Sequence, residues 1–438
     1  MHHKGRFPNA FFGASPRLDS AALAILVLLL FLIFVFLFLT LTAQPAQAQT
    51  YQVIYNFTGG ADGAFPEAGL TMDRAGNSYG TTVYGGVGCP NGSLPGCGTV
   101  FKLSHRGSGW VLTTIYRFQG GSDGANPYAQ VVIGPDGSLY GTTYLGGRGC
   151  DSYGCGTVFK LRPGPSATGS WTETVLYRFA GSPDGFSPNA AVVFDQAGNL
   201  YGTTINGGTF GVGSVFKLTP SDGGWTENVL YSFSNGNDGS YPTSSVIFDQ
   251  IGNLYGTTTF GGGSLGCLIG CGTIFQLTRS GSDWTEKVLY RFQGRSDGGY
   301  VYAGLIFDGS GNLYGATGFL GSGNGGTVFE LTPSGGNWTF NLLYSFTGQG
   351  GPYDSLLMDT AGNFYGTTGL DGLYQGGSVF RLTLSNGRWT ETDLYSFTGF
   401  SDGGQPFSGV ILDANCNLYG TAVEAGAYGY GVVWEVTP

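Results

Sequence analysis

Two carboxyl groups, Glu67 and Asp354, are the residues of this sequence best placed to do chemistry, because each stands where similar segments of the chain carry a neutral residue. Cleavage of a glycosidic bond needs only two such acids, so carboxylate chemistry is open to this chain, and so is a Ca²⁺ site. His105 is the only histidine after position 48. Ser-His-Asp catalysis and His-rich metal sites are therefore excluded at every site that the fold does not bring close to His105. The sequence calls for no cofactor.

Six of the seven cysteines form three closely spaced pairs, and the second member of each pair directly precedes a Gly-Thr: Cys89 and Cys97, Cys150 and Cys155, Cys267 and Cys271. In an exported protein such pairs predict local disulfides. The alternative to disulfides is a metal site, but the three pairs lie far apart along the chain and no histidine accompanies them. Cys416 is unpaired and takes the glycine position of a recurring turn, so we expect a free thiol.

The elements that must position these residues are seven copies of one unit. The copies are 51 to 61 residues apart when aligned on the tyrosine of the recurring Tyr-Gly pair: Tyr79, Tyr140, Tyr201, Tyr255, Tyr314, Tyr365 and Tyr419. Each copy predicts four short strands, which we name a to d; in the third copy they are 191–195, 199–204, 213–219 and 225–233. No window shows helical periodicity. Four-stranded antiparallel units at a regular period predict the blades of an all-β, seven-bladed propeller.

The two ends of the repeat region predict that the ring is closed. The region opens on a d strand (51–57) and stops after a c strand (431–438). The first d strand would therefore complete the last blade, and no strand edge would be left unpaired. We expect this propeller domain to span 51–438.

The recurring words "NLYGTT", "GTVFKL" and "LYSFTG" resemble the GloVer tandem repeat of exported bacterial proteins, whose anchoring segments differ from member to member. The resemblance covers 51–438. It implies an exported β-propeller, and it implies no activity, because the family has no established biochemical function.

Residues 1–50 form a separate export segment. Lys4, Arg6 and Arg17 precede the uncharged stretch 21–41, and an Ala-x-Ala follows at 46–48. This pattern predicts a signal peptide that is cleaved after Ala48. The apolar stretch is also long enough to span a bilayer, so an uncleaved N-terminal membrane anchor is the alternative. Both place the propeller outside the cytoplasm, secreted, periplasmic or at the cell surface.

The composition of the chain limits the classes of partner that it is expected to bind. After residue 48 the chain has 15 basic and 27 acidic residues, a net charge of −12. This balance disfavours nucleic acid and anionic lipid, so membrane contact is expected only through the N-terminal segment. Glycine is abundant, but 15% aromatic and 11% charged residues are typical of a packed, turn-rich β protein. We expect a monomer.

Most recurring polar and aromatic residues have structural explanations. The aspartate that ends strand a is expected to shape the a–b turn: Asp73, Asp195, Asp249, Asp308, Asp359 and Asp413. The tryptophan that opens strand d is expected to pack between blades: Trp171, Trp225, Trp284, Trp338 and Trp389. Basic residues of strand c are expected to pair with glutamates of strand d, as Lys160 with Glu173, Lys217 with Glu227 and Arg381 with Glu391.

The residues that change between copies point to one face. In an antiparallel blade the d–a and b–c links emerge on one face, and the a–b and c–d links on the other. The a–b turn keeps its length, whereas the b–c loops vary and hold the cysteine pairs. One position at the end of the d–a link differs between copies. The seven residues at this position should together encircle the channel mouth: Glu67, Tyr128, Asn189, Thr243, Tyr302, Tyr353 and Phe407. The next two residues are small, except Gln130 and Asp354.

Two hypotheses follow for this mouth. The leading one is a non-enzymatic binding module at the cell exterior, whose tyrosines and short polar groups suit a glycan or a peptide. The alternative is an extracellular hydrolase or lyase acting on a carbohydrate or lactone, with Glu67 and Asp354 as the acids. Only analogy with other propellers motivates the second.

Overall fold

A computed structural model describes residues 28–30 and 49–437, except 87, 90–94, 108, 148, 151–152, 166–168 and 282. The predicted signal segment thus lies outside the described residues, apart from a helical turn at 28–30. The repeat region belongs to one compact unit, Gln49–Pro438. No helix within the described residues is long and apolar enough to cross a membrane.

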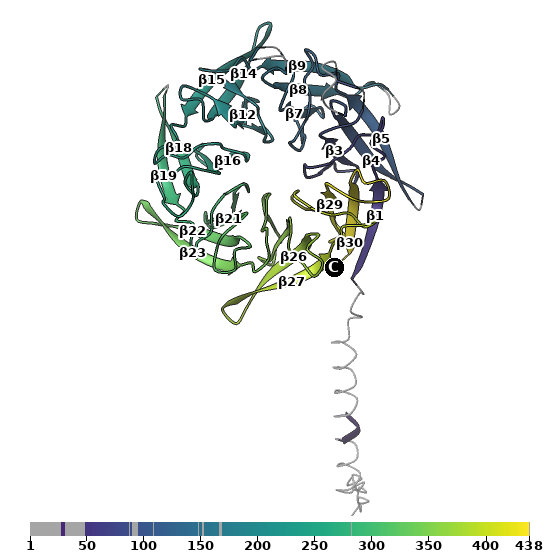
Figure 1. The fold of residues 1–438 in the computed structure, drawn as a ribbon, viewed down its shortest axis with the longest axis vertical. Helices are drawn as coiled ribbons and strands as arrows, with labels where there is room; N and C mark the ends of the chain where they lie inside the picture. Colours follow the sequence, from purple (N-terminus) through teal and green to yellow (C-terminus); the bar gives the residue numbers. More distant parts are fainter. Residues whose placement is uncertain are drawn as a thin grey trace, which may run out of the picture. The chain divides into compact units, whose positions relative to one another are not determined.

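Seven four-stranded antiparallel sheets form a ring, which confirms the predicted propeller (Figure 1). Blade 1 consists of β2 (Thr71–Met72), β3 (Ser78–Thr82), β4 (Thr99–Arg106) and β5 (Gly109–Arg117). Blade 2 consists of β6 (Val132–Ile133), β7 (Leu139–Thr143), β8 (Thr157–Arg162) and β9 (Thr172–Arg178). Blades 3 and 4 consist of β11 (Val193–Phe194), β12 (Leu200–Thr204), β14 (Ser214–Ser221), β15 (Gly224–Ser232), and β16 (Ile247–Phe248), β17 (Leu254–Thr258), β18 (Thr273–Ser280), β19 (Asp283–Arg291).

Blades 5 and 6 consist of β20 (Ile306–Phe307), β21 (Leu313–Thr317), β22 (Thr327–Ser334), β23 (Asn337–Ser345), and β24 (Leu357–Met358), β25 (Phe364–Thr368), β26 (Ser378–Ser385), β27 (Arg388–Ser396). Blade 7 consists of β28 (Ile411–Leu412), β29 (Leu418–Ala422), β30 (Val432–Thr437) and β1 (Thr50–Asn56). Because β1 pairs with β30 along its length, from Thr50 opposite Thr437 to Asn56 opposite Val432, the ring is closed as predicted.

The innermost strands are shorter than predicted, with two residues each instead of five. In blade 3 the predicted strand 191–195 is reduced to Val193–Phe194. The residues just before each inner strand line the channel instead of continuing the ladder. The part of each repeat that varies therefore lies along the axis, outside the regular sheet.

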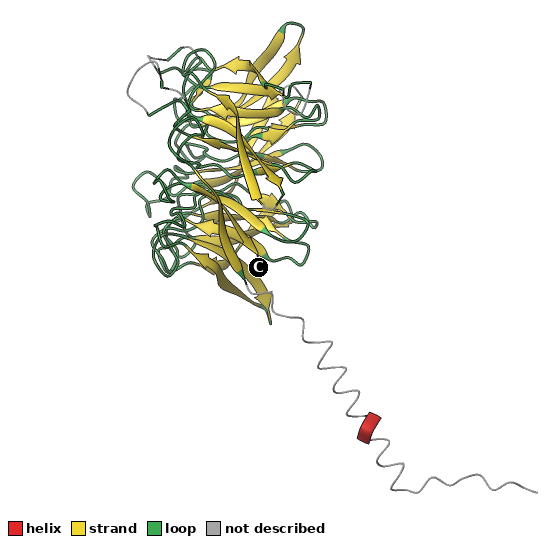
Figure 2. Ribbon diagram, turned by 90° about the vertical axis from the view of Figure 1, so that its right-hand side faces the viewer, coloured by secondary structure: helices red, strands yellow, loops and turns green. Residues whose placement is uncertain are grey.

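The two faces of the ring carry different connections, as the strand order predicts (Figure 2). On one face, which we call the mouth face, the d–a link pairs with the b–c loop of the same blade. Examples are the bridge between Ala64 and Tyr84, and the short pair β10 (Gly185–Phe186) with β13 (Asn206–Gly207). The opposite face carries the a–b and c–d turns.

An edge-to-face aromatic pair fills each of the seven seams between blades. The phenylalanine that follows strand d packs on an aromatic residue in strand c of the next blade, with ring centroids 5.0–5.9 Å apart: Phe57–Phe101, Phe118–Phe159, Phe179–Phe216, Phe233–Phe275, Phe292–Phe329, Phe346–Phe380 and Phe397–Trp434. All are buried. The strand-c ring also lies over the glycine of the Tyr-Gly pair in its own blade, where a Cβ would come within 2.3–2.8 Å of it.

The recurring aspartates and tryptophans have the structural roles that the sequence predicts. In blade 3, Asp195 accepts hydrogen bonds from the amides of Ala197 and Asn199, and from the hydroxyl of Tyr201. Trp284 of blade 4 packs edge-on against the same Tyr201, with centroids 6.5 Å apart. These contacts fix the a–b turn and tie it to the neighbouring blade.

The predicted pairing of strand-c bases with strand-d glutamates is wrong. The two-residue c–d turn of blade 3 sets Lys217 opposite Asn228 and Glu227 opposite Leu218. Successive residues of a strand point to opposite faces of the sheet, so the two charges lie on different sides of the blade. Blades 2 and 6 show the same register for Lys160 and Glu173, and for Arg381 and Glu391. Lys160 instead pairs with Asp136 at 2.6 Å.

The strand-d glutamates are half-buried at the seams, where each lies near the strand-d tyrosine of the preceding blade. One carboxyl oxygen of each has no hydrogen-bond partner among the described residues: Glu173, Glu227, Glu286 and Glu391. Burial, and then a neighbouring aspartate such as Asp184 beside Glu227, raise the pKa of each to about 7.

The three predicted disulfides are present, with Cα–Cα distances of 5.2–5.4 Å: Cys89–Cys97, Cys150–Cys155 and Cys267–Cys271. They indicate an oxidising compartment other than the cytoplasm. Cys416 is free and exposed, and its φ of +66° is that of the glycine it replaces.

We expect Gly315→Ala to lower the free energy of unfolding by about 1–3 kcal/mol, because the new methyl group would overlap the ring of Phe329, 2.6 Å away. Gly309→Ala in the same blade is the matched control, since a Cβ there meets nothing within 4 Å. Urea unfolding of both variants measures the difference. Equal loss in the two variants would contradict the role of the ring.

We expect the ring to lose stability as pH rises from about 4.5 to about 7. The pKa of the four seam glutamates is raised from 4.5 to about 7 in the folded state, so their contribution is complete below 4.5 and is lost as the pH passes through 7. The turn aspartates act at lower pH, because their pKa values are lowered from 3.8. Melting temperatures at pH 5 and pH 8 test this. Replacing the four glutamates with glutamine should flatten the profile, and an unchanged slope would refute the assignment.

Candidate functional site

The residues predicted to encircle the channel all line one cavity of about 690 Å³ at the axis of the ring. Its lining includes Gln130, two residues after Tyr128, and Asp354, which directly follows Tyr353. It also includes all seven variable positions: Glu67, Tyr128, Asn189, Thr243, Tyr302, Tyr353 and Phe407. The seven variable residues are partly exposed. The sequence thus located the cavity lining, but not how its residues are grouped.

One half of the mouth, over blades 5 to 7, is aromatic. The rings of Tyr302 and Tyr353 stack with centroids 5.2 Å apart, and Phe407 meets Tyr353 edge-on at 4.8 Å. Phe319, at the start of a b–c loop, supports Tyr353 from outside the ring of seven at 5.7 Å. We call Tyr302, Tyr353 and Phe407 the aromatic arc. It offers a continuous π surface along one side of the opening.

The other half of the mouth, over blades 1 to 4, is polar. Its variable residues are Glu67, Tyr128, Asn189 and Thr243, which we call the polar arc. Burial raises the pKa of Glu67 to about 7, so near neutral pH this carboxyl group can donate or accept a hydrogen bond. Burial, a hydrogen bond with Tyr84 and the nearby Glu67 raise the pKa of Tyr128, which keeps its phenol a donor.

Gln130 and Asp354 converge below the mouth. A Cβ on Gly69 would lie 2.9 Å from Oε1 of Gln130 and 3.7 Å from Oδ2 of Asp354, so the two side chains approach Gly69 together. Asp354 accepts hydrogen bonds from the amide of Ser355 at 2.6 Å and from that of Gly409, in blade 7, at 2.7 Å. Burial raises the pKa of Asp354.

A threonine contact that the sequence did not reveal joins neighbouring blades and is missing beside Asp354. In six blades the first threonine after the Tyr-Gly pair donates to a backbone carbonyl of the next blade at 2.6–3.1 Å: Thr81, Thr142, Thr203, Thr257, Thr367 and Thr421. Thr421 donates to Ala68 and so joins blade 7 to blade 1. Blade 5 carries Ala316 instead, and its expected acceptor in blade 6 is Asp354. The exception to the pattern thus falls where the acid enters the channel.

Glu67 and Asp354, the acids of the alternative hypothesis, line the same cavity. The pKa of Glu67 is raised by burial alone, and that of Asp354 is shifted by burial and by its hydrogen bonds. Neither carboxyl group contributes to the shift of the other. Because both Asp354 oxygens already hold backbone amides, the geometry favours a role in fixing the channel wall. Among the described residues no three His, Cys, Asp or Glu side chains gather to hold a metal ion.

Exposed apolar side chains surround the same mouth at the tips of the b–c loops. Leu265 and Leu268 of blade 4 are fully exposed, and blades 3, 6 and 7 add further large side chains: Phe210, Leu373, Tyr374 and Tyr428. Phe400, in a d–a link, is 76% exposed. Sequence reasoning marked these loops as variable but did not single out their tips.

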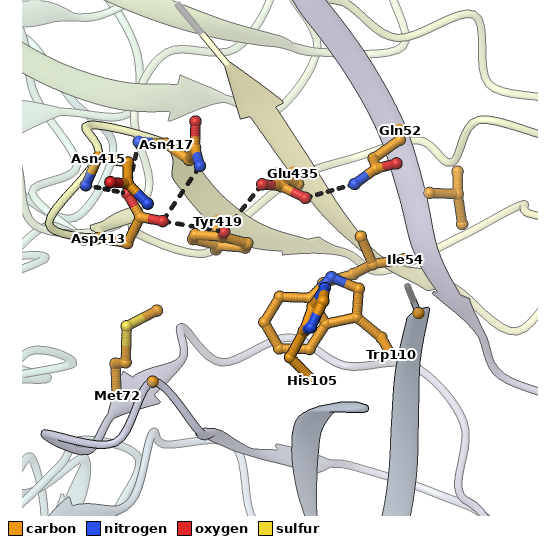
Figure 3. Close-up of a pocket in the computed structure, with 13 residues that line it drawn as sticks. Gln52, Ile54, Met72, His105, Trp110, Asp413, Asn415, Asn417, Tyr419 and Glu435 are labelled. Carbon is orange, nitrogen blue, oxygen red and sulfur yellow. Dashed lines mark hydrogen bonds between the residues drawn. The ribbon is translucent and has the colours of Figure 1, made fainter. Parts of the chain in front are cut away.

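A second pocket, of about 570 Å³, lies on the opposite face where the ring closes between blades 7 and 1 (Figure 3). The pocket is lined by residues from the a–b turn of blade 7, from β1 and from the c–d turn of blade 1, His105 among them. In Figure 3, Glu435 and Tyr419 face Trp110 and Met72 across the gap. The Trp110 ring lies 5.7 Å from that of Tyr419, edge-on, which gives it the same seam position as the other strand-d tryptophans.

The chain belongs to the Gloeobacter/Verrucomicrobia repeat family, whose model matches residues 40–164, 89–269 and 265–438. This confirms the resemblance that the recurring words carry. A search of curated proteins finds no significant match.

Several solved structures are similar to this chain at low sequence identity. One is a protein from Bacteroides uniformis that is proposed to be a 6-phosphogluconolactonase. It is 13% identical to this chain, with a TM-score of 0.47, and the match covers 74% of this chain and 82% of that protein. A proposed oxidoreductase of the glucose dehydrogenase type, from Thermus thermophilus, is 15% identical, with a TM-score of 0.43 and coverage of 89% and 100%. A Dyadobacter fermentans protein of unknown function is 12% identical, with a TM-score of 0.43 and coverage of 89% and 98%.

Proposed function

We propose that this protein is an exported, non-enzymatic binding module, and that the mouth of its channel holds a glycan. The observation that carries the proposal is the division of one cavity mouth into an aromatic arc and a polar arc. A sugar ring has an apolar C–H face and a hydroxyl edge. The first can stack on Tyr302 and Tyr353 while the second reaches the polar groups opposite.

Two further features support a carbohydrate ligand. Glu67, Asn189 and Thr243 are short side chains that accept and donate hydrogen bonds, and all three line the cavity. The exposed aromatic side chains of Phe210, Tyr374 and Tyr428 surround the mouth on the same face, where they can stack on further units of a chain. A ligand of several sugar units therefore fits this face better than a single small molecule.

A cell-exterior location agrees with this ligand. The three disulfides indicate a compartment outside the reducing cytoplasm, and glycans are abundant ligands there. The predicted signal peptide, or membrane anchor, would deliver the chain to it.

We expect Tyr353→Leu to weaken glycan binding by about 1–3 kcal/mol, because it removes the ring at the centre of the aromatic arc. Tyr353→Phe is the matched control: it keeps the ring and loses only the hydroxyl group, so affinity should stay within a small factor of the original. Calorimetric titration with a glycan found by array screening measures both.

Melting curves separate binding from folding in this pair of variants. We expect the melting temperature of Tyr353→Leu to change little, because the position already differs among the seven blades. If that variant melts several degrees lower while its affinity is unchanged, the aromatic arc only covers the inner strands. A peptide that binds where no glycan does would reassign the ligand class.

A further inference from the structure

The closing-seam pocket of Figure 3 lies beside Tyr419, which lacks two side chains that pack on the equivalent tyrosine in other seams. In every blade the tyrosine of strand b lies opposite one residue of strand c: Tyr79–Lys102, Tyr140–Lys160, Tyr201–Lys217, Tyr255–Gln276, Tyr314–Glu330, Tyr365–Arg381 and Tyr419–Glu435. In blades 1 to 3 that residue is a lysine, and its ammonium group lies 5.3–5.5 Å from the centre of the tyrosine ring. These three seams thus carry an internal cation over the ring.

A phenylalanine fills the other side of the tyrosine in three seams. Strand a of the next blade supplies it, edge-on, with centroids 4.9–5.1 Å apart: Phe194 on Tyr140, Phe248 on Tyr201 and Phe307 on Tyr255. At the closing seam the equivalent residue is Met72, which lines the pocket. Tyr419 therefore has neither the lysine nor the phenylalanine. Tyr314 of blade 5 also lacks both, with Glu330 and Met358 in their places, but there the ring of Phe364 packs on Tyr314 with centroids 4.9 Å apart. Blade 1 has Ser78 at the position of Phe364, and a cavity of about 570 Å³ lies beside Tyr419.

The charge of this pocket suits a cation. Glu435 is only 9% exposed, and its oxygens accept hydrogen bonds from the Tyr419 hydroxyl at 2.8 Å and the Gln52 amide at 2.5 Å. Both donors are neutral, and a carboxylate can accept more than two hydrogen bonds. Asp413 adds a second carboxyl group, and the described residues of the lining include no lysine or arginine. His105 lies at the edge, packed on Trp110 at 5.2 Å.

We propose that this pocket binds a primary ammonium group carried on an alkyl chain. The ammonium would replace the missing lysine, between Glu435 and the Tyr419 ring, and its methylene groups would contact Met72 and Trp110. A free diamine and a lysine side chain of another protein present the same chemistry. The site is separate from the channel mouth and does not depend on the glycan.

Three compounds test the chemistry by calorimetric titration of the protein: putrescine, Nα-acetyl-lysine methylamide, and the uncharged Nα-acetyl-norleucine methylamide. We expect at least one of the two amines to bind and norleucine to bind at least about tenfold more weakly, because it lacks the charge. Tighter binding of putrescine would identify a free amine as the source, and tighter binding of the lysine derivative would identify a side chain. Norleucine binding as tightly as the amines, or no saturable binding of either amine, would overturn the proposal.

Variants copied from the chain's own blades test the location. Glu435→Gln should weaken amine binding about tenfold or more, whereas Glu330→Gln, at the matching position of blade 5, should leave it unchanged. Glu435→Lys should abolish binding, because it introduces the lysine of blades 1 to 3. Met72→Phe should abolish it too, because it introduces the phenylalanine that strand a carries in blades 3 to 5. Melting curves confirm that each variant is folded. Tyr353→Leu should not affect amine binding, which separates this site from the mouth. Unchanged affinity in both Glu435→Gln and Met72→Phe would place the amine elsewhere and refute the site.

Discussion

The packing of an aromatic ring over a glycine is the constraint on which the rest of the ring depends. In every blade the strand-c ring lies over the glycine of strand b, too close for any side chain there, and meets the phenylalanine of the preceding blade edge-on. One ring therefore joins two strands of its own blade to the end of strand d of the preceding blade. The same contact closes the ring, where Phe397 meets Trp434 at 5.9 Å. It accounts for the glycine of strand b and for the aromatic residue opposite it in strand c, both of which are present in all seven blades.

Because these contacts occupy the seams, the residues at the ends of the strands are free to change. The threonine that follows the glycine ties each blade to the next, except where Ala316 precedes Asp354. The variable residues next to that contact form the aromatic and polar arcs around one cavity. At the closing seam, Met72, Ser78 and Glu435 stand where other seams carry a ring, a larger apolar residue and a lysine, and a pocket lies beside them. Repetition builds the framework, and local departures from it create both candidate sites.

Much of this could be predicted from the sequence, because the relevant interactions are local or periodic. The spacing of the tyrosines gave the number of blades, the order of strands at the two ends gave the closure, and close spacing gave the disulfides. The predicted ion pairs failed because a one-residue difference in register puts Lys217 and Glu227 on opposite sides of a blade. The hydrogen bond from the Gly409 amide to Asp354 and the closing-seam pocket could not be predicted, because each involves residues on neighbouring blades. Within a single repeat nothing shows which side chain is missing across a seam.

Glycan-array profiling of the protein beside a variant with both Tyr302→Leu and Tyr353→Leu tests the central claim most directly, because the pair removes the stacked rings and leaves the seams intact. The account predicts a small, related group of glycans that the original protein binds and the variant does not, while both melt at similar temperatures. Glycan binding that persists in the variant, or no binding by the original protein across the array, would contradict it.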